Sequence, residues 1–309
     1  TLMVGTAGLP HVIIRFYTVP KASDARWSAG WALVFIGLLY TTAPAVAVFS
    51  KYNLLNTLAN KPVEEVRQID WVQKWEQTGL LKLQDKNGDG ILQMSANPDV
   101  NEVTIDRDII VLSTPEVAKL SPFIVGLVAA GGLAAALSTA AGLLIVIASA
   151  ISHDLYTRLI NPGASEATKL LIARVVIFLV VVLAAPFGIN PPAFIAQLVA
   201  FAFGLAASTF FPAILLGIFD RRMNMQGAVA GMIVGLVFTA SYIIGTKYLG
   251  WPNFILGITA EGLGAIGMLL NFVVAYLVSR ATPPPPEEIQ HLVDEIRIPK
   301  GSAGSALEH

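Results

Sequence analysis

The sequence predicts an all-α polytopic membrane protein, and three observations carry that prediction. The 309 residues are 55% hydrophobic and only 13% charged, against about 25% charged in ordinary soluble domains. Apolar runs long enough to cross about 30 Å of hydrocarbon recur along the chain. Lys and Arg gather at alternate ends of these runs, as in the cytoplasmic loops of membrane proteins. The net charge of −1 gives no electrostatic reason to bind nucleic acid.

Six full spans are expected, in chain order, at 28–50, 121–150, 168–189, 193–219, 226–246 and 253–280. Residues 1–19 form a shorter apolar segment that opens inside a helix, so we take the chain as part of a longer protein. Residues 51–120 form a mixed polar and aromatic insertion. Residues 283–300 form a tail with a short amphipathic piece at 289–298, and 301–309 resemble a linker and tag remnant.

The basic residues of the short loops predict the orientation of the spans. They precede the first span, follow the second, follow the fourth and follow the sixth: Arg15, Lys21, Arg26, Arg158, Lys169, Arg221, Arg222 and Arg280. All of these ends fall on one side, which we assign to the cytoplasm. The C-terminus is then cytoplasmic and the insertion at 51–120 is extracytoplasmic.

The second span contains the stretch "AAALSTAAGLL", with two adjacent hydroxyls among small residues. One interpretation is packing, in which small side chains let neighbouring helices approach and the hydroxyls bond to carbonyls one turn earlier. The other is a cation site. Ala135, Ser138 and Thr139 lie at i, i+3 and i+4, so a carbonyl and two hydroxyl oxygens share one side of the helix. The spacing alone leaves both interpretations open.

Three stretches resemble the sodium:solute symporter family. They are "AALSTAAGLLIVIASAISHDLY" at 135–156, "GTAGLPHVIIRFYTVP" at 5–20 and "FGLAASTFFPAILLGIFDRRMNMQGAVAGMIVG" at 203–235. Their order and orientation agree with the distribution of Lys and Arg. Within the family, the first part of the chain is most similar to the bacterial cation/acetate branch of short-chain monocarboxylate symporters.

The resemblance implies a LeuT-type inverted-repeat transporter fold, of which this chain carries the second inverted repeat and the peripheral helices. It implies that 1–19 is the second half of broken core helix 6, 20–50 is core helix 7 and 121–152 is core helix 8. Residues 167–219 would be core helices 9 and 10, and 226–282 two peripheral helices. The N-terminal half of the transporter is then missing from this sequence.

The implied function is secondary active transport in the bacterial cytoplasmic (inner) membrane, namely sodium-coupled uptake of a small monocarboxylate such as acetate by alternating access. By the resemblance, Ala135, Ser138 and Thr139 are sodium ligands, and a partner helix completes the ion's shell. Two alternatives stay open: a transporter-like ligand sensor without net transport, and a structural membrane subunit. The scattered histidines form no enzyme constellation. A small accessory membrane subunit is a further partner that the sequence leaves open.

A carboxylate substrate needs hydrogen-bond donors or a helix N-terminus inside the membrane. The candidates are an unwound start of the chain and one face of the fourth span: Gly5, Thr6, Gln197, Phe201 and Ser208. For Gln197 the alternative is a structural interhelical hydrogen bond. Glu261, expected inside the last span, is interpreted as a packing contact rather than a proton relay.

The insertion contains "DKNGDGILQ", which matches the front of an EF-hand calcium loop. Asp85, Asn87 and Asp89 occupy positions 1, 3 and 5, and Ile91 occupies position 7, which ligates through its backbone carbonyl. Position 12 is Ala96, where a bidentate Glu belongs. Calcium (Ca2+) binding and a metal-free turn therefore both remain open.

Overall fold

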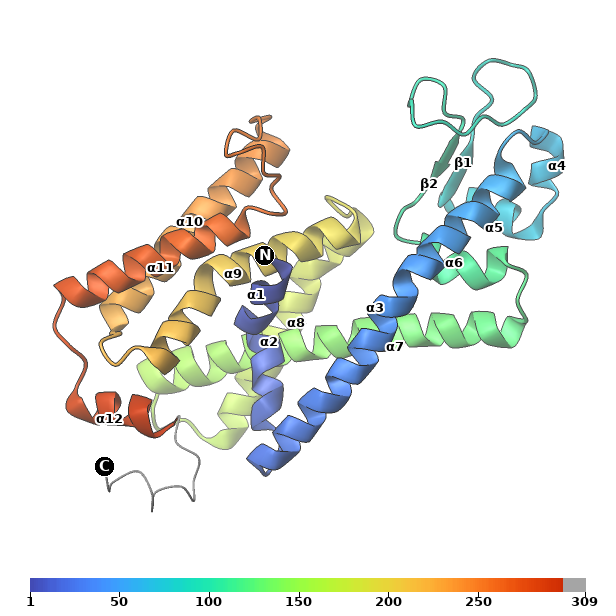
Figure 1. The fold of residues 1–309 in the computed structure, drawn as a ribbon. Coiled ribbons are helices and arrows are strands. Elements are labelled where there is room, and N and C mark those ends of the chain that lie inside the picture. Colours follow the sequence, from blue (N-terminus) through green and yellow to red (C-terminus); the bar gives the residue numbers. More distant parts are fainter. Residues whose placement is uncertain (297–309) are drawn as a thin grey trace. The chain divides into compact units, whose positions relative to one another are not determined.

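The computed structural model describes residues 1–296, and helices dominate that part of the chain (Figure 1). Six described helices are long and apolar enough to cross a membrane. They are α3 (Ala22–Leu58), α7 (Pro122–Ser149) continued by the π-helix η2 (Ala150–Ile160), α8 (Glu166–Ile189), α9 (Ile195–Phe219), α10 (Met225–Tyr248) and α11 (Gly264–Ala281). The prediction of an all-α polytopic membrane protein is confirmed.

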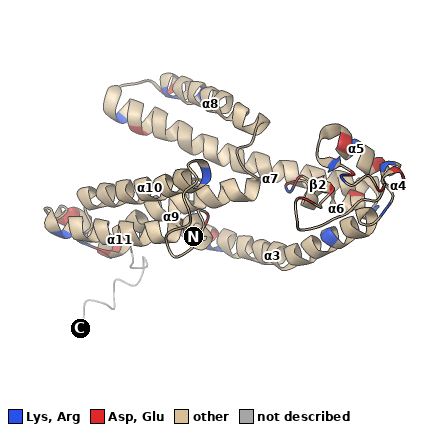
Figure 2. Cartoon of the chain, turned by 90° about the horizontal axis from the view of Figure 1, so that it is seen from above, with Lys and Arg blue, Asp and Glu red and all other residues tan. Residues whose placement is uncertain are grey.

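Charged side chains avoid the apolar spans. In the described part of the chain, they gather at helix ends and in the segment between α3 and α7 (Figure 2). This is the distribution that the cost of burying charge in hydrocarbon requires. The predicted linker and tag remnant at 301–309 and the end of the predicted tail lie outside the described residues.

The last span is shorter than the sequence predicts. The expected span at 253–280 begins at Gly264 in the structure, and the residues before it form a loop. Gly250, Leu256 and Gly257 have positive φ angles, which no helix accommodates. Pro252 has no backbone N–H to donate to a helix. The apolar side chains of this loop mimic a span in hydropathy but not in backbone conformation.

The chain divides into two compact units. The first consists of Thr1–Thr18 together with the chain from Leu183, and the second of Val19–Val182. The first unit contains α1 (Leu2–Gly8), α2 (Pro10–Ile13), the 3₁₀ turn η1 (Ile14–Tyr17), α9, α10, α11 and α12 (Glu287–Glu295). Helix α8 begins in the second unit and ends in the first.

Glycines bring the helices of the first unit into backbone contact. Gly227, Gly231 and Gly235 recur every fourth residue along α10 and are buried. A Cβ atom at Gly235 would lie 1.9 Å from the carbonyl oxygen of Ser208 on α9, and one at Gly231 would lie 2.2 Å from the side chain of Asn271 on α11. Small residues at this spacing are a common means of packing membrane helices.

An asparagine on α11 compensates for a proline in α9. Pro212 cannot donate to the carbonyl of Ser208 one turn earlier, so that carbonyl loses its partner within the helix. The side-chain amide of Asn271 donates to it at 2.7 Å and to the carbonyl of Thr209 at 2.9 Å. Asn271 is fully buried. The amide therefore holds α11 against the interrupted turn of α9.

The second unit contains a folded segment between α3 and α7. It comprises α4 (Val63–Arg67), α5 (Asp70–Thr78), the antiparallel strands β1 (Leu81–Leu83) and β2 (Val103–Ile105), and α6 (Ile110–Val117). Its apolar core includes the last turns of α3: Leu54, Leu58, Val63, Val66, Trp71, Val72, Trp75, Leu81, Leu83, Leu92, Val103 and Val117. Because this core holds the end of α3, the helix continues past the predicted end at residue 50.

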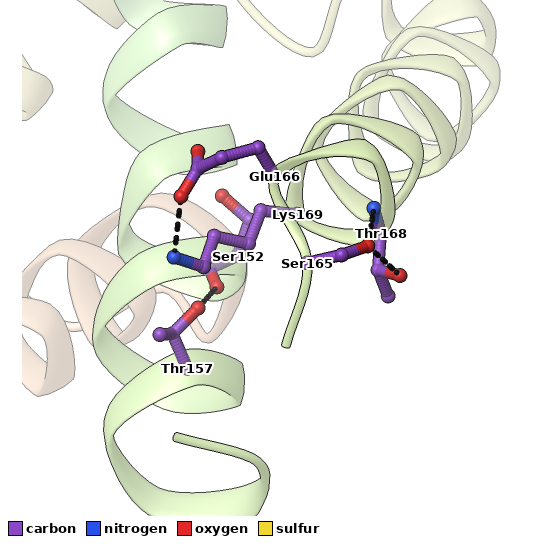
Figure 3. Close-up of polar contacts among 6 residues, drawn as sticks. All are labelled: Ser152, Thr157, Ser165, Glu166, Thr168 and Lys169. Carbon is purple, nitrogen blue, oxygen red and sulfur yellow. Dashed lines mark hydrogen bonds and ion pairs between the residues drawn. The ribbon is translucent and has the colours of Figure 1, made fainter. Parts of the chain in front are cut away.

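A wide helical turn precedes α8. The Thr157 hydroxyl donates to the carbonyl of Ser152, five residues earlier, at 2.8 Å, as expected in a π-helix. Figure 3 shows this bond beside the start of α8. There the Ser165 hydroxyl accepts the backbone N–H of Thr168 at 3.2 Å, which caps the helix. Local hydrogen bonds therefore support the wide turn of η2 and the beginning of α8.

Candidate functional site

The three predicted sodium ligands lie together on α7. Thr139 donates its hydroxyl to the carbonyl of Ala135 at 3.2 Å. This is the bond to a carbonyl one turn earlier that the packing interpretation predicts, and the cation site stays a prediction. Ala135, Ser138 and Thr139 are all exposed in the described part of the chain. Among the described residues of α7, only Ala148 is buried.

The start of the chain is helical rather than unwound, which corrects the expected backbone; the substrate contacts of Gly5 and Thr6 stay a prediction. Residues 2–8 form α1, and the amide of Gly5 donates to the carbonyl of Thr1 at 2.8 Å. A Cβ atom at Gly5 would lie 2.3 Å from the carbonyl oxygen of Phe203, so α1 touches the backbone of α9. Thr6 is exposed, and its hydroxyl bonds to the carbonyl of Leu2 at 2.9 Å.

The third predicted candidate, Gln197, takes part in an ionic cluster of the first unit. Its amide nitrogen Nε2 donates to Oε1 of Glu261 at 2.5 Å. The ammonium of Lys247, near the end of α10, lies 3.0 Å from the same oxygen. The same ammonium lies 5.9 Å from the ring centroid of Phe201, a candidate from the same predicted face. The interhelical bond weighed for Gln197 thus joins α9 to the loop before α11.

Glu261 is ionised at neutral pH. It lies in the loop before α11, outside the spanning helices. Partial burial acts to raise its pKa, but hydrogen bonds from Gln197, Thr259, its own backbone amide and Lys247 outweigh burial and lower the pKa to about 2. A permanently charged carboxylate is suited to an ion pair rather than to a proton relay at neutral pH.

The cluster opens into a cavity of about 480 Å³, here called the Lys247 pocket. Its lining combines polar side chains with apolar walls: Phe194, Gln197, Thr246, Lys247, Trp251, Pro252, Asn253, Thr259, Ala260 and Glu261. A pocket of this size with a few convergent polar groups is typical of small-molecule sites.

Ser208, the last substrate candidate, lies elsewhere. Its side chain is fully buried and its hydroxyl donates to the carbonyl of Leu205 at 3.1 Å. Gly235 and Gly267 pack directly against it from α10 and α11. The structure therefore places Gln197 and Phe201 near one another but does not gather all five candidates into one pocket.

The predicted calcium loop closes on itself. The carboxylate of Asp85 accepts the backbone N–H groups of Gly88 at 2.7 Å and Gly90 at 2.9 Å, and Asp89 accepts that of Ile91 at 2.8 Å. The Asn87 amide donates to Asp89 at 2.9 Å. Among residues 1–296, no group of three or more His, Cys, Asp or Glu side chains is placed to hold a metal ion. These hydrogen bonds close the turn, and calcium binding at this loop stays a prediction.

Two residues of these sites escaped sequence reasoning. The other Lys and Arg place the end of the fifth predicted span on the extracytoplasmic side. Lys247 follows that end, and a basic residue there is an exception that marks the position in the sequence. Glu102 is 2% exposed, and its carboxylate accepts the backbone N–H groups of Lys86 at 2.8 Å and Gln93 at 2.9 Å. No local sequence pattern indicates the buried position of Glu102, because its hydrogen-bond donors come from the preceding loop.

Comparison with known proteins identifies the family. Residues 94–235 match the model of the sodium:solute symporter family. An uncharacterized symporter of Cupriavidus necator is 41% identical over 304 residues, which cover 96% of this chain and 43% of that protein. A monocarboxylic acid transporter of Corynebacterium glutamicum is 32% identical over 248 residues, covering 76% of this chain and 36% of that protein. The chain spans about two fifths of the length of these relatives. It is a multi-pass membrane protein that belongs to the sodium:solute symporter family.

Proposed function

We propose that the protein to which this chain belongs is a secondary active transporter that takes up a small monocarboxylate, such as acetate, with sodium. The observation that carries the proposal is the match of residues 94–235, which include Ala135, Ser138 and Thr139, to the sodium:solute symporter family. Membership of a sodium:solute symporter family supports sodium as the coupling ion. The name of the Corynebacterium relative supports a monocarboxylate as the solute. Transport, rather than enzymatic catalysis, is the activity that both relatives' names favour.

The ion site of the proposal has a physical basis. Carbonyl and hydroxyl oxygens replace part of the hydration shell of sodium without placing a fixed negative charge in the membrane. Ala135, Ser138 and Thr139 offer three oxygens, too few for a hard cation. We assign the remaining ligands to a segment of the full-length protein outside this chain, which covers 43% of the Cupriavidus relative.

Coupling follows from differential affinity. A sodium ion held between α7 and a helix of another bundle stabilises the arrangement in which both contribute ligands. In the LeuT-type fold that we propose, two bundles rock against one another around sites at the bilayer midplane. Helices α3, α7, α8 and α9 would then be core helices 7 to 10, with α10 and α11 peripheral. The proposal places the protein in the bacterial inner membrane with its C-terminus in the cytoplasm.

The test is uptake of labelled acetate into proteoliposomes that hold the full-length protein. An inward sodium gradient should drive accumulation, an equal potassium gradient should not, and a sodium ionophore should abolish it. Unlabelled propionate should compete and neutral acetamide should not, because the solute is recognised as a carboxylate. A sensor without net transport would bind acetate yet show no accumulation under any gradient, and that result would overturn the proposal.

A further inference from the structure

The Lys247 pocket has a hydrogen-bond donor to spare. An ammonium group carries three N–H donors. The described contacts of Lys247 are the Glu261 carboxylate at 3.0 Å and the ring of Phe201 at 5.9 Å. Its side chain is 36% exposed and lines the cavity. At least one N–H group of this charged ammonium is therefore available to bind a molecule in the pocket.

The acceptor in the pocket, by contrast, is already engaged. Oxygen Oε1 of Glu261 receives both Gln197 and Lys247, and Thr259 also donates to the carboxylate. Donors that converge on one carboxylate neutralise much of its field. The remaining N–H donor of Lys247 therefore needs an acceptor from the ligand. A cationic ligand would be repelled by the Lys247 ammonium.

The pocket walls are built before any ligand arrives. The indole of Trp251 packs on Gly245 so closely that a Cβ atom there would lie 2.0 Å from it. The Trp251 amide donates to the Gly245 carbonyl at 2.9 Å. The Tyr242 hydroxyl holds the same loop by donating to the carbonyl of Ile258 at 2.8 Å. A rigid aromatic wall beside a charged group reduces the ordering cost of binding.

We propose that the Lys247 pocket is a second binding site for a short-chain monocarboxylate. The ligand's carboxylate pairs with the Lys247 ammonium, and its short hydrocarbon chain lies against Trp251. A monocarboxylate fits the pocket better than a dianion, because the described lining holds one cationic side chain, Lys247, and offers no cation to a second negative charge. The positive-inside assignment puts this pocket at the extracytoplasmic ends of α9 and α10. It is thus a first contact for an incoming solute, a role that rests on the proposed function.

The test uses the full-length protein in detergent with choline in place of sodium. Binding of 3-fluoropropionate is followed by the broadening of its fluorine NMR line, which detects weak exchange. Wild type should show saturable broadening that unlabelled acetate reverses. Lys247→Gln should weaken binding roughly 10–100-fold, the range expected for loss of a charged hydrogen bond. Lys247→Arg, the matched control, should retain binding.

A second variant separates loss of the ligand contact from loss of the fold. Lys247→Gln removes the partner of Glu261, so we pair it with Glu261→Gln to leave a neutral amide pair. This double variant should unfold cooperatively, which shows that it is folded, and should still fail to bind. Equal broadening in wild type and in the folded double variant, or no saturable broadening in wild type, overturns the proposal.

The outcome is distinguishable from failure of the proposed function. Ser138→Ala/Thr139→Ala should keep sodium-free binding at Lys247 while losing sodium-driven uptake. If wild type binds through Lys247 but accumulates nothing, the transport proposal fails and the pocket stands. If uptake is sodium-driven while binding is independent of Lys247, the pocket fails and the transport proposal stands.

Discussion

At the scale of single residues, buried polar groups of the first unit are matched to specific backbone defects. The carbonyl of Ser208 loses its helical partner to Pro212, and Asn271 restores a donor at 2.7 Å. Sequence shows the proline and the asparagine but not that they meet, because 59 residues of chain separate Pro212 from Asn271. For Gln197 the sequence indicates an interhelical bond but not its partner, Glu261.

Replacing Asn271 by Leu should destabilise the protein by about 1–3 kcal/mol, the cost of a buried carbonyl left without a donor. Pro212→Ala restores the backbone N–H that the Ser208 carbonyl lacks, so Asn271→Leu should cost less in that background. Thermal melting of the four proteins of this double-mutant cycle measures the coupling. Equal costs of Asn271→Leu with and without Pro212 would show that the amide does not serve this carbonyl.

Glu261 should contribute stability above its unfolded pKa. Its pKa in the folded protein is lowered to about 2 from 4.5. A depressed pKa means that the stabilisation is complete above the unfolded value and is lost as pH falls from about 4.5 towards 2. The ammonium of Lys247 faces this carboxylate at 3.0 Å.

The melting temperature of wild type should therefore exceed that of Glu261→Gln by a constant margin between pH 7 and pH 5. The margin should shrink at pH 3.5. The comparison uses both proteins at each pH, which cancels the titration of the other carboxylates. A margin that does not change with pH would contradict the role of the ionised carboxylate.

At the scale of helices and strands, hydropathy predicts the spans well where an apolar stretch also has a helical backbone. Five predicted spans coincide closely with α3, α7, α8, α9 and α10 in their apolar centres. The ends differ where other forces act. The core of the segment between α3 and α7 extends α3 to Leu58, and positive φ angles at Leu256 and Gly257, inside the predicted span, delay α11 to Gly264. Hydropathy records neither tertiary contacts nor backbone conformation.

Helix packing in the first unit should depend on Gly235. A methyl group there would lie 1.9 Å from the Ser208 carbonyl, a backbone atom that cannot rotate away. Gly235→Ala should cost about 1–3 kcal/mol, as overpacking does. Gly217→Ala on α9 is the matched control, since a Cβ there meets no atom within 4 Å. Thermal unfolding in detergent checks both; similar melting of the two variants would refute the close contact.

At the scale of the whole molecule, the sequence predicted the family but only part of the candidate sites. The oxygen face of α7 was readable, since helical spacing alone puts Ala135, Ser138 and Thr139 on one side. The Lys247 pocket was not, because it forms from α9, α10 and a loop that hydropathy counted as a span. The chain covers about two fifths of its relatives, and the proposed ion site needs ligands that we assign to the rest of the full-length protein.

The most direct test of the central claim is the sodium concentration that gives half-maximal acetate uptake by the full-length protein in proteoliposomes. Thr139→Ser keeps the hydroxyl and should stay within about twofold of wild type. Ser138→Ala/Thr139→Ala removes two oxygens and should raise that concentration roughly tenfold or more, equivalent to about 1.4 kcal/mol. An unchanged sodium dependence in the folded double variant would contradict the assignment of these hydroxyls to the coupling ion.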